Sequence, residues 1–332
     1  MTTSPATVKA KAIIQVGIVV RDIQATMESF WSIFGIGPWS VITFGTPSVQ
    51  NLKYFGKHNW CRCNVAFSQV GPLEIELFEP VEGVSPYQDW LDNVGEGLHH
   101  LKFVGEDLNI ERIERLMLEQ GFPSFFSGGS RIAQFCYFDI MPTHCIWETS
   151  TRLGGPVANS VQYPADPKAI SQTKVKVQSI DQVGIVVKDI QKTIEAYWNI
   201  FSIGPWEIND YEYPAIYDRT YCGKPAWARE RTARALIGDV ELELIQVIDG
   251  ESIHSDYLNA HGEGLHHLRF AVDDLRKATK TLTEQGFVSL QSGKYGSTQE
   301  MTGFDYMYIN PLHCIWEIYQ HRKGEEHDKC PG

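Results

Sequence analysis

The first half of the chain opens with two contrasting hydrophobic patterns. Residues 13–20 form an apolar, β-branched run, interrupted by Gln15 and Gly17, that is typical of a buried strand. Asp22 then stands where an N-cap is expected, and the apolar residues that follow have helical spacing up to Gly35. Those residues are Ile23, Met27, Phe30, Trp31 and Phe34. The pattern therefore predicts a strand that leads directly into an amphipathic helix.

The rest of this half predicts further strands and a second helix. Residues 73–77 alternate strictly, which places Glu74 and Glu76 on one face of a strand. Residues 110–117 have the spacing of an amphipathic helix. Strand-like runs also cover residues 98–101, 136–139 and 144–148. Because side chains alternate along a strand, we expect His99 and His100 to face opposite sides, with His99 in a structural role.

The whole pattern of expected strands and helices occurs twice along the chain. Gly-Glu-Gly-Leu-His-His-Leu at 95–101 returns unchanged at 262–268, an offset of 167 residues. A weaker repeat of 85 residues, from Gln15 to His100, divides each half into two strand–helix–strands modules. Strands grouped around one helix per module predict an α+β fold. We expect a first domain at 11–150, a linker at 151–176 that is rich in Gly, Pro and Ser, a second domain at 177–322 and a tail at 323–332.

Composition narrows the class of protein. The net charge of −12 argues against nucleic acid and anionic membrane surfaces as partners, because both require basic patches. No apolar stretch approaches the ~20 residues of a membrane span, and the N-terminal residues do not resemble a signal peptide. The seven cysteines lack the spacing of a disulfide framework. We therefore expect a cytoplasmic protein with free thiols, as a monomer or homodimer.

Four polar residues stand on the expected strands of each half. They are Gln15, Glu76, His100 and Glu148 in the first half and Gln182, Glu243, His267 and Glu317 in the second. An amide oxygen, two carboxylates and an imidazole suit a divalent ion such as zinc, cobalt, manganese or nickel. Taken singly, each residue is more typical of a solvated strand face or a hydrogen-bonded core position. Their joint recurrence favours a metal site in each half.

These features resemble a known family. The four-module plan, the Gly-Leu-His-His-Leu strand and the closing Ile-Trp-Glu resemble the vicinal oxygen chelate superfamily (glyoxalase, bleomycin resistance and extradiol dioxygenase proteins), and methylmalonyl-CoA epimerase most of all. The resemblance implies two tandem domains, each built from two βαβββ modules whose mixed sheets curl around a cleft. It also implies that the two four-residue sets above are the metal ligands.

The sequence departs from the epimerases in two ways. They have histidine on the first strand, where this chain has Gln15 and Gln182, so its ligand set is more similar to that of eukaryotic glyoxalase I. Yet the arginine that glyoxalase I carries four residues after its glutamine is Val19 or Val186 here. The epimerases' second acid/base carboxylate has no clear match either. Glu230 lies in the right region of the second half, its counterpart is Cys63, and His58 and Arg62 are nearby polar alternatives.

The resemblance implies an isomerase, epimerase or related lyase that removes a proton next to the carbonyl of a small-molecule substrate and stabilises a metal-chelated enolate. Glu148 and Glu317 would be the bases, whereas Glu76 and Glu243 would be plain ligands. One alternative is an iron-dependent ring-cleaving or α-keto-acid dioxygenase. Such sites typically use two histidines and one carboxylate, and each half offers one correctly facing histidine, which places iron behind the other metals. A second alternative is a non-catalytic protein that sequesters a ligand.

The pairing of modules is open to two interpretations. Each half can build its own site, or the halves can exchange modules so that Gln15 and Glu76 meet His267 and Glu317. We expect unshared sites, because the epimerase-like features outnumber the glyoxalase-like ones. On that interpretation the first half, expressed alone, should bind metal as a monomer.

Overall fold

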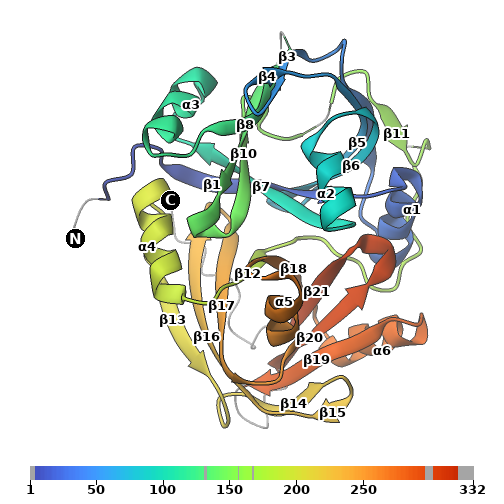
Figure 1. Ribbon diagram of the computed structural model, residues 1–332. Helices are drawn as coiled ribbons and strands as arrows, with labels where there is room; N and C mark the ends of the chain where they lie inside the picture. The colour runs from blue at the N-terminus through green and yellow to red at the C-terminus, as the bar shows by residue number, and fades with distance from the viewer. Residues whose placement is uncertain (1–3, 131–132, 156, 167, 296–301, 321–332) are drawn as a thin grey trace.

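The computed structural model describes residues 4–130, 133–155, 157–166, 168–295 and 302–320, so the expected tail at 323–332 lies outside the described residues. Each half of the chain forms its own curled mixed sheet. Figure 1 shows the first half, coloured blue to green, stacked on the second, coloured yellow to red. The predicted α+β architecture of two tandem domains is confirmed.

The first sheet has eleven strands within the described residues, in the spatial order β11-β2-β5-β6-β1-β7-β10-β9-β8-β3-β4. They are β1 (Ala10–Val19), β2 (Trp39–Gly45), β3 (Gln50–Tyr54), β4 (Lys57–His58), β5 (Cys61–Val70), β6 (Leu73–Gly83), β7 (Gly97–Gly105), β8 (Ser124–Gly129), β9 (Gln134–Ile140), β10 (Cys145–Ser150) and β11 (Val161–Tyr163).

The second sheet repeats this plan with ten strands in the described residues, in the order β13-β16-β17-β12-β18-β21-β20-β19-β14-β15. They are β12 (Gln182–Val186), β13 (Glu207–Tyr211), β14 (Tyr217–Tyr221), β15 (Lys224–Pro225), β16 (Ala228–Ile237), β17 (Val240–Gly250), β18 (Gly264–Ala271), β19 (Val288–Tyr295), β20 (Thr302–Ile309) and β21 (Cys314–Gln320).

Helices connect the strands and cover the outside of the sheets. They are α1 (Ile23–Phe34), α2 (Pro86–Asn93), α3 (Ile110–Glu119), α4 (Ile190–Phe201), α5 (Ile253–His261) and α6 (Leu275–Glu284), with short 3₁₀ turns η1 (Met141–Thr143) and η2 (Asn310–Leu312). The expected cap is present, since the Asp22 carboxylate accepts from the Ala25 N–H at 2.9 Å. Helix α3 is capped by Asn109, whose side chain accepts from the Arg112 N–H. None of the described helices is long and apolar enough to cross a membrane.

The curl of each sheet follows from its connections. The central pair β1 and β7 is antiparallel and joins the two modules of the first half. β2 lies at one side of the sheet, yet the hairpin of β3 and β4 that follows it pairs with β8 at the opposite side. The short link from Gly45 to Gln50 can span this distance because the sheet bends until its two sides approach each other. The inner face of the sheet therefore encloses a cavity.

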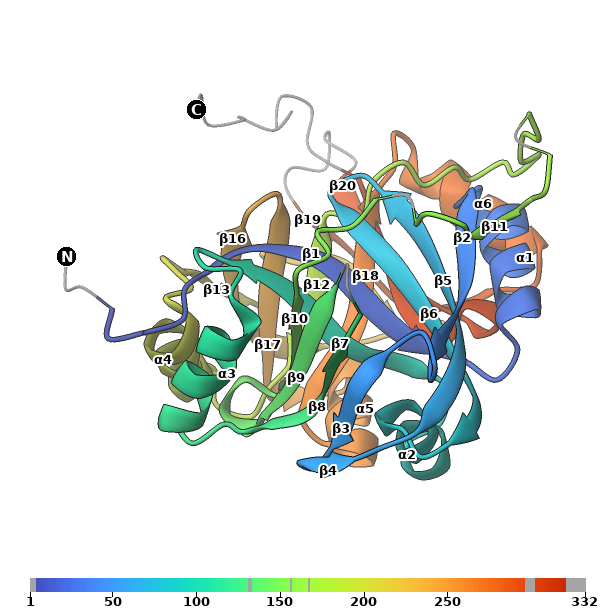
Figure 2. The same ribbon diagram turned by 90° about the horizontal axis from the view of Figure 1, so that it is seen from above.

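The two halves share a hydrophobic core. Helix α1 of the first half places Phe34 against Phe270 and Trp316 of the second half, with ring centroids 5.0 and 5.1 Å apart. In the same way, Phe201 of α4 packs against Phe103 and Trp147 of the first half, at 5.1 and 5.0 Å. Helix α1 also contacts the turn η2 of the second half, and α4 contacts the turn η1 of the first. Figure 2 shows α3 and α4 on one side of the molecule and α1 and α6 on the other. Each half thus covers apolar surface of the other.

The segment expected as a linker, residues 151–176, is part of this structure. Its strand β11 pairs antiparallel with β2 at the edge of the first sheet. Arg152 forms a bidentate ion pair with the buried Glu74, at 2.7 and 2.8 Å. Ser171 donates a hydrogen bond to the Trp31 carbonyl at the end of α1. The segment therefore braces the first half while connecting it to the second.

Candidate metal centres

The four candidate ligands of the first half lie on four neighbouring strands at the centre of the sheet. Gly17 of β1 is directly opposite Glu76 of β6 on one side and His100 of β7 on the other. Gln15 is two residues before Gly17 on β1, and Glu148 is two residues after Ile146, the residue of β10 that is opposite His100. Residues separated by two share a face of a strand. All four side chains therefore project from the same inner face.

The structure brings Glu76, His100 and Glu148 together, with their candidate donor atoms within 4.8 Å of one another. His100 Nε2 is 3.3 Å from Glu148 Oε2 and 3.6 Å from Glu76 Oε2. Gln15 donates its amide N–H to Glu74, which leaves its Oε1 buried and without a hydrogen-bond partner among the described residues. Glu76 Oε2 is likewise buried and unpartnered there. Buried acceptors without donors are the arrangement that a cation would satisfy.

The surroundings of the first set shift the pKa values of its two carboxyl groups in opposite directions. Burial raises the pKa of Glu76. Burial also opposes ionisation of Glu148, but Lys102, His100 and the Tyr137 hydroxyl outweigh it and lower the pKa of that carboxyl to about 2. Lys102 Nζ lies 3.5 Å from Glu148 Oε1, and Tyr137 donates to Oε2 at 3.0 Å. Glu148 therefore stays ionised at neutral pH.

The second half repeats the geometry with its own residues. Glu243, His267 and Glu317 have candidate donor atoms within 4.8 Å of one another, and His267 Nε2 is 3.4 Å from both Glu317 Oε2 and Gln182 Oε1. Glu317 Oε2 is buried and has no hydrogen-bond partner in the described part of the chain. Burial and the carboxylates of Glu317 and Glu241 raise the pKa of Glu243 to about 8. Each set is thus assembled within one half, and the described residues contain no mixed cluster.

The expectation that His99 and His100 face opposite sides is wrong. β7 carries a bulge, because Gly17 of β1 is opposite His100 whereas Ile18 is already opposite Leu98. The additional residue, His99, turns toward His100, and their Nδ1 atoms are 2.9 Å apart. This hydrogen bond orients the His100 ring and leaves its Nε2 directed at the carboxylates. His266 and His267 repeat the contact at 3.0 Å.

A glycine makes room for His100 in the first half and for His267 in the second. A Cβ atom on Gly17 would lie 1.9 Å from Cε1 of His100, and one on Gly184 would lie 2.0 Å from Cε1 of His267. No other residue type leaves this space. In the sequence, a glycine inside an otherwise β-branched strand of each half was the sign that another group approaches the backbone closely there.

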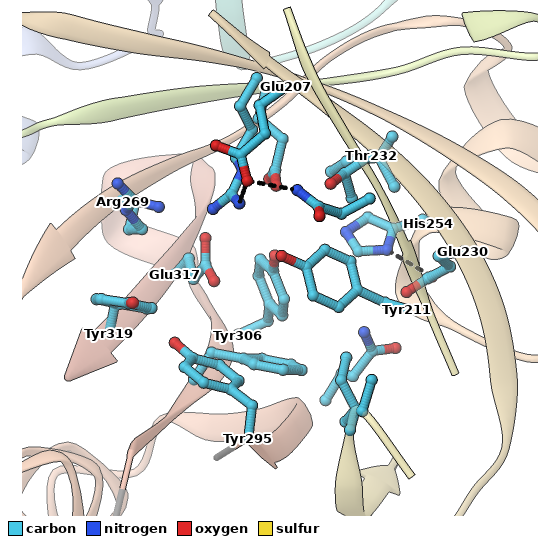
Figure 3. Close-up of a pocket in the computed structure, with 18 of the residues that line it drawn as sticks. Glu207, Tyr211, Glu230, Thr232, His254, Arg269, Tyr295, Tyr306, Glu317 and Tyr319 are labelled. Atoms are coloured by element: carbon cyan, nitrogen blue, oxygen red, sulfur yellow. Dashed lines mark hydrogen bonds and ion pairs between the residues drawn. The ribbon is translucent and has the colours of Figure 1, made fainter. Parts of the chain in front are cut away.

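The two cavities that contain these sets are lined differently. The first, of about 850 Å³, has mainly apolar and aromatic walls. The second, of about 720 Å³, has tyrosines, the charged residues Arg234 and Glu230, and the imidazole of His254. Figure 3 shows Glu230 and His254 side by side in its wall. Glu148 lines the first cavity and Glu317 lines the second. Both candidate bases can therefore reach a bound substrate.

Of the candidates for a second acid/base group, only Glu230 lines one of these two cavities. Glu230 lies in the second cavity, where it accepts from Arg219 at 2.7 Å and is 2.8 Å from Nδ1 of His254. In the first half, His58 is exposed and Arg62 forms an exposed ion pair with Glu82 at 2.8 Å. Neither is among the residues that line the first cavity.

The sequence analysis did not identify several residues that lie near the sites. Tyr87 and His254 enter the cavities from α2 and α5, two short helices that hydrophobic periodicity did not indicate. Their detectable signals were the capping serines Ser85 and Ser252, each directly before its helix. Lys102, beside Glu148, was hidden within an apolar strand.

Comparison with known proteins identifies the family. The sequence profile of the Glyoxalase/Bleomycin resistance protein/Dioxygenase superfamily matches residues 14–137 and 181–306, which is more than half of the chain. The chain belongs to this superfamily. The match falls once in each half, in agreement with the two sheets.

Individual relatives are more distant. The uncharacterized protein YqjC of Bacillus subtilis (strain 168) is 36% identical over 76 residues, which is 22% of this chain and 54% of that protein. This chain therefore matches about half the length of that curated relative. A triple mutant of 4-hydroxymandelate synthase from Streptomyces coelicolor has a similar structure, with a TM-score of 0.61 and 14% identity over 95% of this chain and 93% of that chain.

A fusion protein of a xylose isomerase-like TIM barrel and 4-hydroxyphenylpyruvate dioxygenase is also similar. Its TM-score is 0.52 at 12% identity, over 99% of this chain and 52% of that chain. At these identities both structures support the fold alone.

Proposed function

We propose that the protein is a divalent-metal-dependent isomerase or epimerase, or a related lyase, that removes a proton next to a carbonyl group. One observation carries the proposal. In both halves a histidine and two glutamates converge within 4.8 Å in a buried site at the wall of a cavity. Histidine nitrogen and carboxylate oxygen suit zinc, cobalt, manganese or nickel.

The proposed ligands are Gln15, Glu76, His100 and Glu148 in the first half and Gln182, Glu243, His267 and Glu317 in the second. Three of their oxygens, Gln15 Oε1, Glu76 Oε2 and Glu317 Oε2, are buried and make no hydrogen bond to a described residue, which fits a cation. A bound divalent ion supplies Lewis-acid stabilisation of negative charge on two neighbouring substrate oxygens.

Glu148 and Glu317 are the proposed bases. A carboxylate that accepts a proton must be ionised, and the surroundings lower the pKa of both residues despite their burial. The base takes the proton from the carbon next to the carbonyl, and the two electrons of that bond remain on the substrate. Return of a proton to the opposite face gives epimerisation, whereas return to a neighbouring carbon gives isomerisation.

A dioxygenase reaction is the second candidate, since the fusion protein named above includes a dioxygenase. Each set described here contains one imidazole and two carboxylates, whereas the facial triad of iron oxygenases has two histidines and one carboxylate. The donor set therefore favours proton transfer. A protein that only sequesters a ligand would not require two carboxylates in each cavity.

Incubation of the metal-loaded protein with candidate carbon acids in deuterated water tests the proposal. We expect deuterium to enter the position next to the carbonyl, detected by NMR. Exchange should collapse in the double variant Glu148→Gln with Glu317→Gln, which keeps an oxygen ligand but removes the base. Glu82→Gln, at an exposed ion pair, is the control that should leave exchange unchanged. Bound iron with oxygen uptake, and no exchange, would instead support the dioxygenase.

A further inference from the structure

The two cavities occupy equivalent places in the fold but present different chemistry. Equivalent positions in the two halves can be compared through strand register. Phe44 lines the first cavity where Tyr211 lines the second. Phe67 is likewise replaced by Arg234, and these two residues lie opposite the equivalent candidate ligands Glu76 and Glu243.

Two further positions of the second cavity carry polar groups. His254 lines it from the second residue of α5, where α2 of the first half has Tyr87. Gln291 lines it opposite Tyr306, where the first sheet has Phe126, a residue that does not line the first cavity. The apolar positions Phe44 and Phe67 of the first cavity are thus polar in the second, while the proposed metal ligands are the same in both.

Several of the polar groups in the second cavity lack a partner within the protein. The Thr232 hydroxyl and the His254 Nε2 atom are buried and make no hydrogen bond to any described residue. These two side chains are 6% and 3% exposed. Desolvated polar groups without partners are costly unless a ligand completes them. The equivalent residue of the first half, Val65, offers no such group and is not among the residues that line the first cavity.

A buried network holds His254 in place. Arg219 donates to Glu230 Oε2 at 2.7 Å, and Glu230 Oε1 is 2.8 Å from His254 Nδ1. When Nδ1 donates to the carboxylate, Nε2 keeps a lone pair that can accept a hydrogen bond. Figure 3 shows His254 and Thr232 on the side of the cavity opposite Arg269 and Glu317. A ligand between them can contact both the proposed metal set and the polar wall.

We infer that the two sites of this chain take different substrates. The first takes a carbonyl compound with an apolar, aromatic or hydrocarbon tail. The second takes one whose tail carries several hydroxyl groups, which pair with Thr232 and His254. This inference rests on the proposed function for the reacting end of the substrate and adds the class of the tail.

Two hydroxamic acids with the same metal-chelating head test the inference. Phenylacetohydroxamate carries an aromatic tail, and gluconohydroxamate carries a chain of hydroxyls. Each is titrated by calorimetry into full-length, metal-loaded protein in which one site has been removed. His267→Ala leaves the first site, and His100→Ala leaves the second. We expect phenylacetohydroxamate to bind His267→Ala about tenfold tighter than gluconohydroxamate, and the order to reverse in His100→Ala.

The exchanges Thr232→Val and Phe44→Tyr give a second measurement that leaves all proposed ligands intact, because Phe44 lines the first cavity and Thr232 the second. Thr232→Val should weaken gluconohydroxamate about threefold to tenfold, the effect of one hydrogen bond, without weakening phenylacetohydroxamate. Phe44→Tyr adds a hydroxyl to the apolar wall and should weaken phenylacetohydroxamate at the first site. The same ratio of affinities in both single-site variants, or no effect of Thr232→Val, would overturn the inference.

Failure of the proposed function gives a different result. The metal content of each sample is measured by mass spectrometry, so loss of the metal site is seen directly. Saturation-transfer NMR with the same two probes on metal-stripped protein then reports which tail touches the protein. A weaker aromatic signal in Phe44→Tyr, together with a weaker hydroxyl-chain signal in Thr232→Val, supports the inference even without metal. The absence of both effects contradicts it.

Discussion

The position of the His100 ring requires glycine at position 17, because the imidazole lies where a Cβ atom of residue 17 would be. Gly17→Ala should therefore displace the ring, lower the stability of the protein and weaken metal binding at the first site. In a His100→Ala background the methyl group has space, so most of the stability cost should disappear. Urea unfolding of the two single variants and the double variant measures this coupling. Equal costs of Gly17→Ala in both backgrounds would show that the ring is not the obstacle.

The raised pKa of Glu243 affects stability in a defined pH window. Its value is about 8 in the folded protein against 4.5 for the free side chain. Between these values the folded protein keeps a proton that the unfolded chain has lost, so the stability of the metal-free protein falls as pH rises from about 4.5 to about 8. Glu243→Gln should remove this dependence and raise the free energy of unfolding at pH 7 by roughly 2 kcal/mol.

Urea unfolding of metal-free protein at pH 5 and pH 7 checks this prediction. Glu317→Gln is the matched control, because the pKa of Glu317 is lowered in the folded protein and its ionised form contributes stability. That variant should be less stable than the parent at pH 7. A gain from Glu243→Gln that is the same at both pH values would contradict the assignment.

At the scale of secondary-structure elements, the segment between the halves supports the first site. Arg152 holds Glu74, and Glu74 accepts from the Gln15 amide, so the Gln15 oxygen remains free to face the site. Arg152→Met should release Glu74 and lower metal affinity at the first site about tenfold, as losses of groups that orient ligands typically do. Calorimetric metal titration measures the effect. Arg62→Met, at an exposed ion pair, should have none, and equal effects of the two variants would refute this role.

The regular elements could be predicted from the sequence because their signals are local. Asp22, the helical stripe after it and the alternation at 73–77 each depend on neighbouring residues, and all are confirmed. The bulge at His99 could not be predicted, because it arises from pairing with β1, a strand 80 or more residues away. Helices α2 and α5 are too short to show clear periodicity, so Tyr87 and His254 were missed with them.

At the scale of the whole molecule, the halves are joined by aromatic packing that the repeat did not indicate. Phe34 is fully buried and contacts Phe270 and Trp316 of the other half. The two halves should therefore unfold in one transition, and an isolated first half would expose Phe103 and Trp147 to water. The proposed ligands of the first site all lie within the first half. Because the isolated half would lose this packing, the packing does not support the expectation that it binds metal alone.

Phe34→Ala tests this coupling, with an expected loss of about 3–5 kcal/mol for a large buried aromatic side chain. Tryptophan fluorescence and circular dichroism during urea unfolding should report one shared midpoint that shifts for both halves. Phe55→Ala, at a side chain that is 68% exposed, is the control with little effect. Two separate transitions, with one unchanged by Phe34→Ala, would show that the halves are independent.

Metal content is the most direct test of the central claim, that each half builds its own metal site. The full-length protein is loaded with zinc or manganese, dialysed and analysed by mass spectrometry. We expect about two ions per chain in the parent, about one in His100→Ala, about one in His267→Ala and none in the double variant, since each histidine belongs to a separate cluster. Circular dichroism confirms that each variant is folded. Undiminished occupancy in the folded double variant would contradict the account.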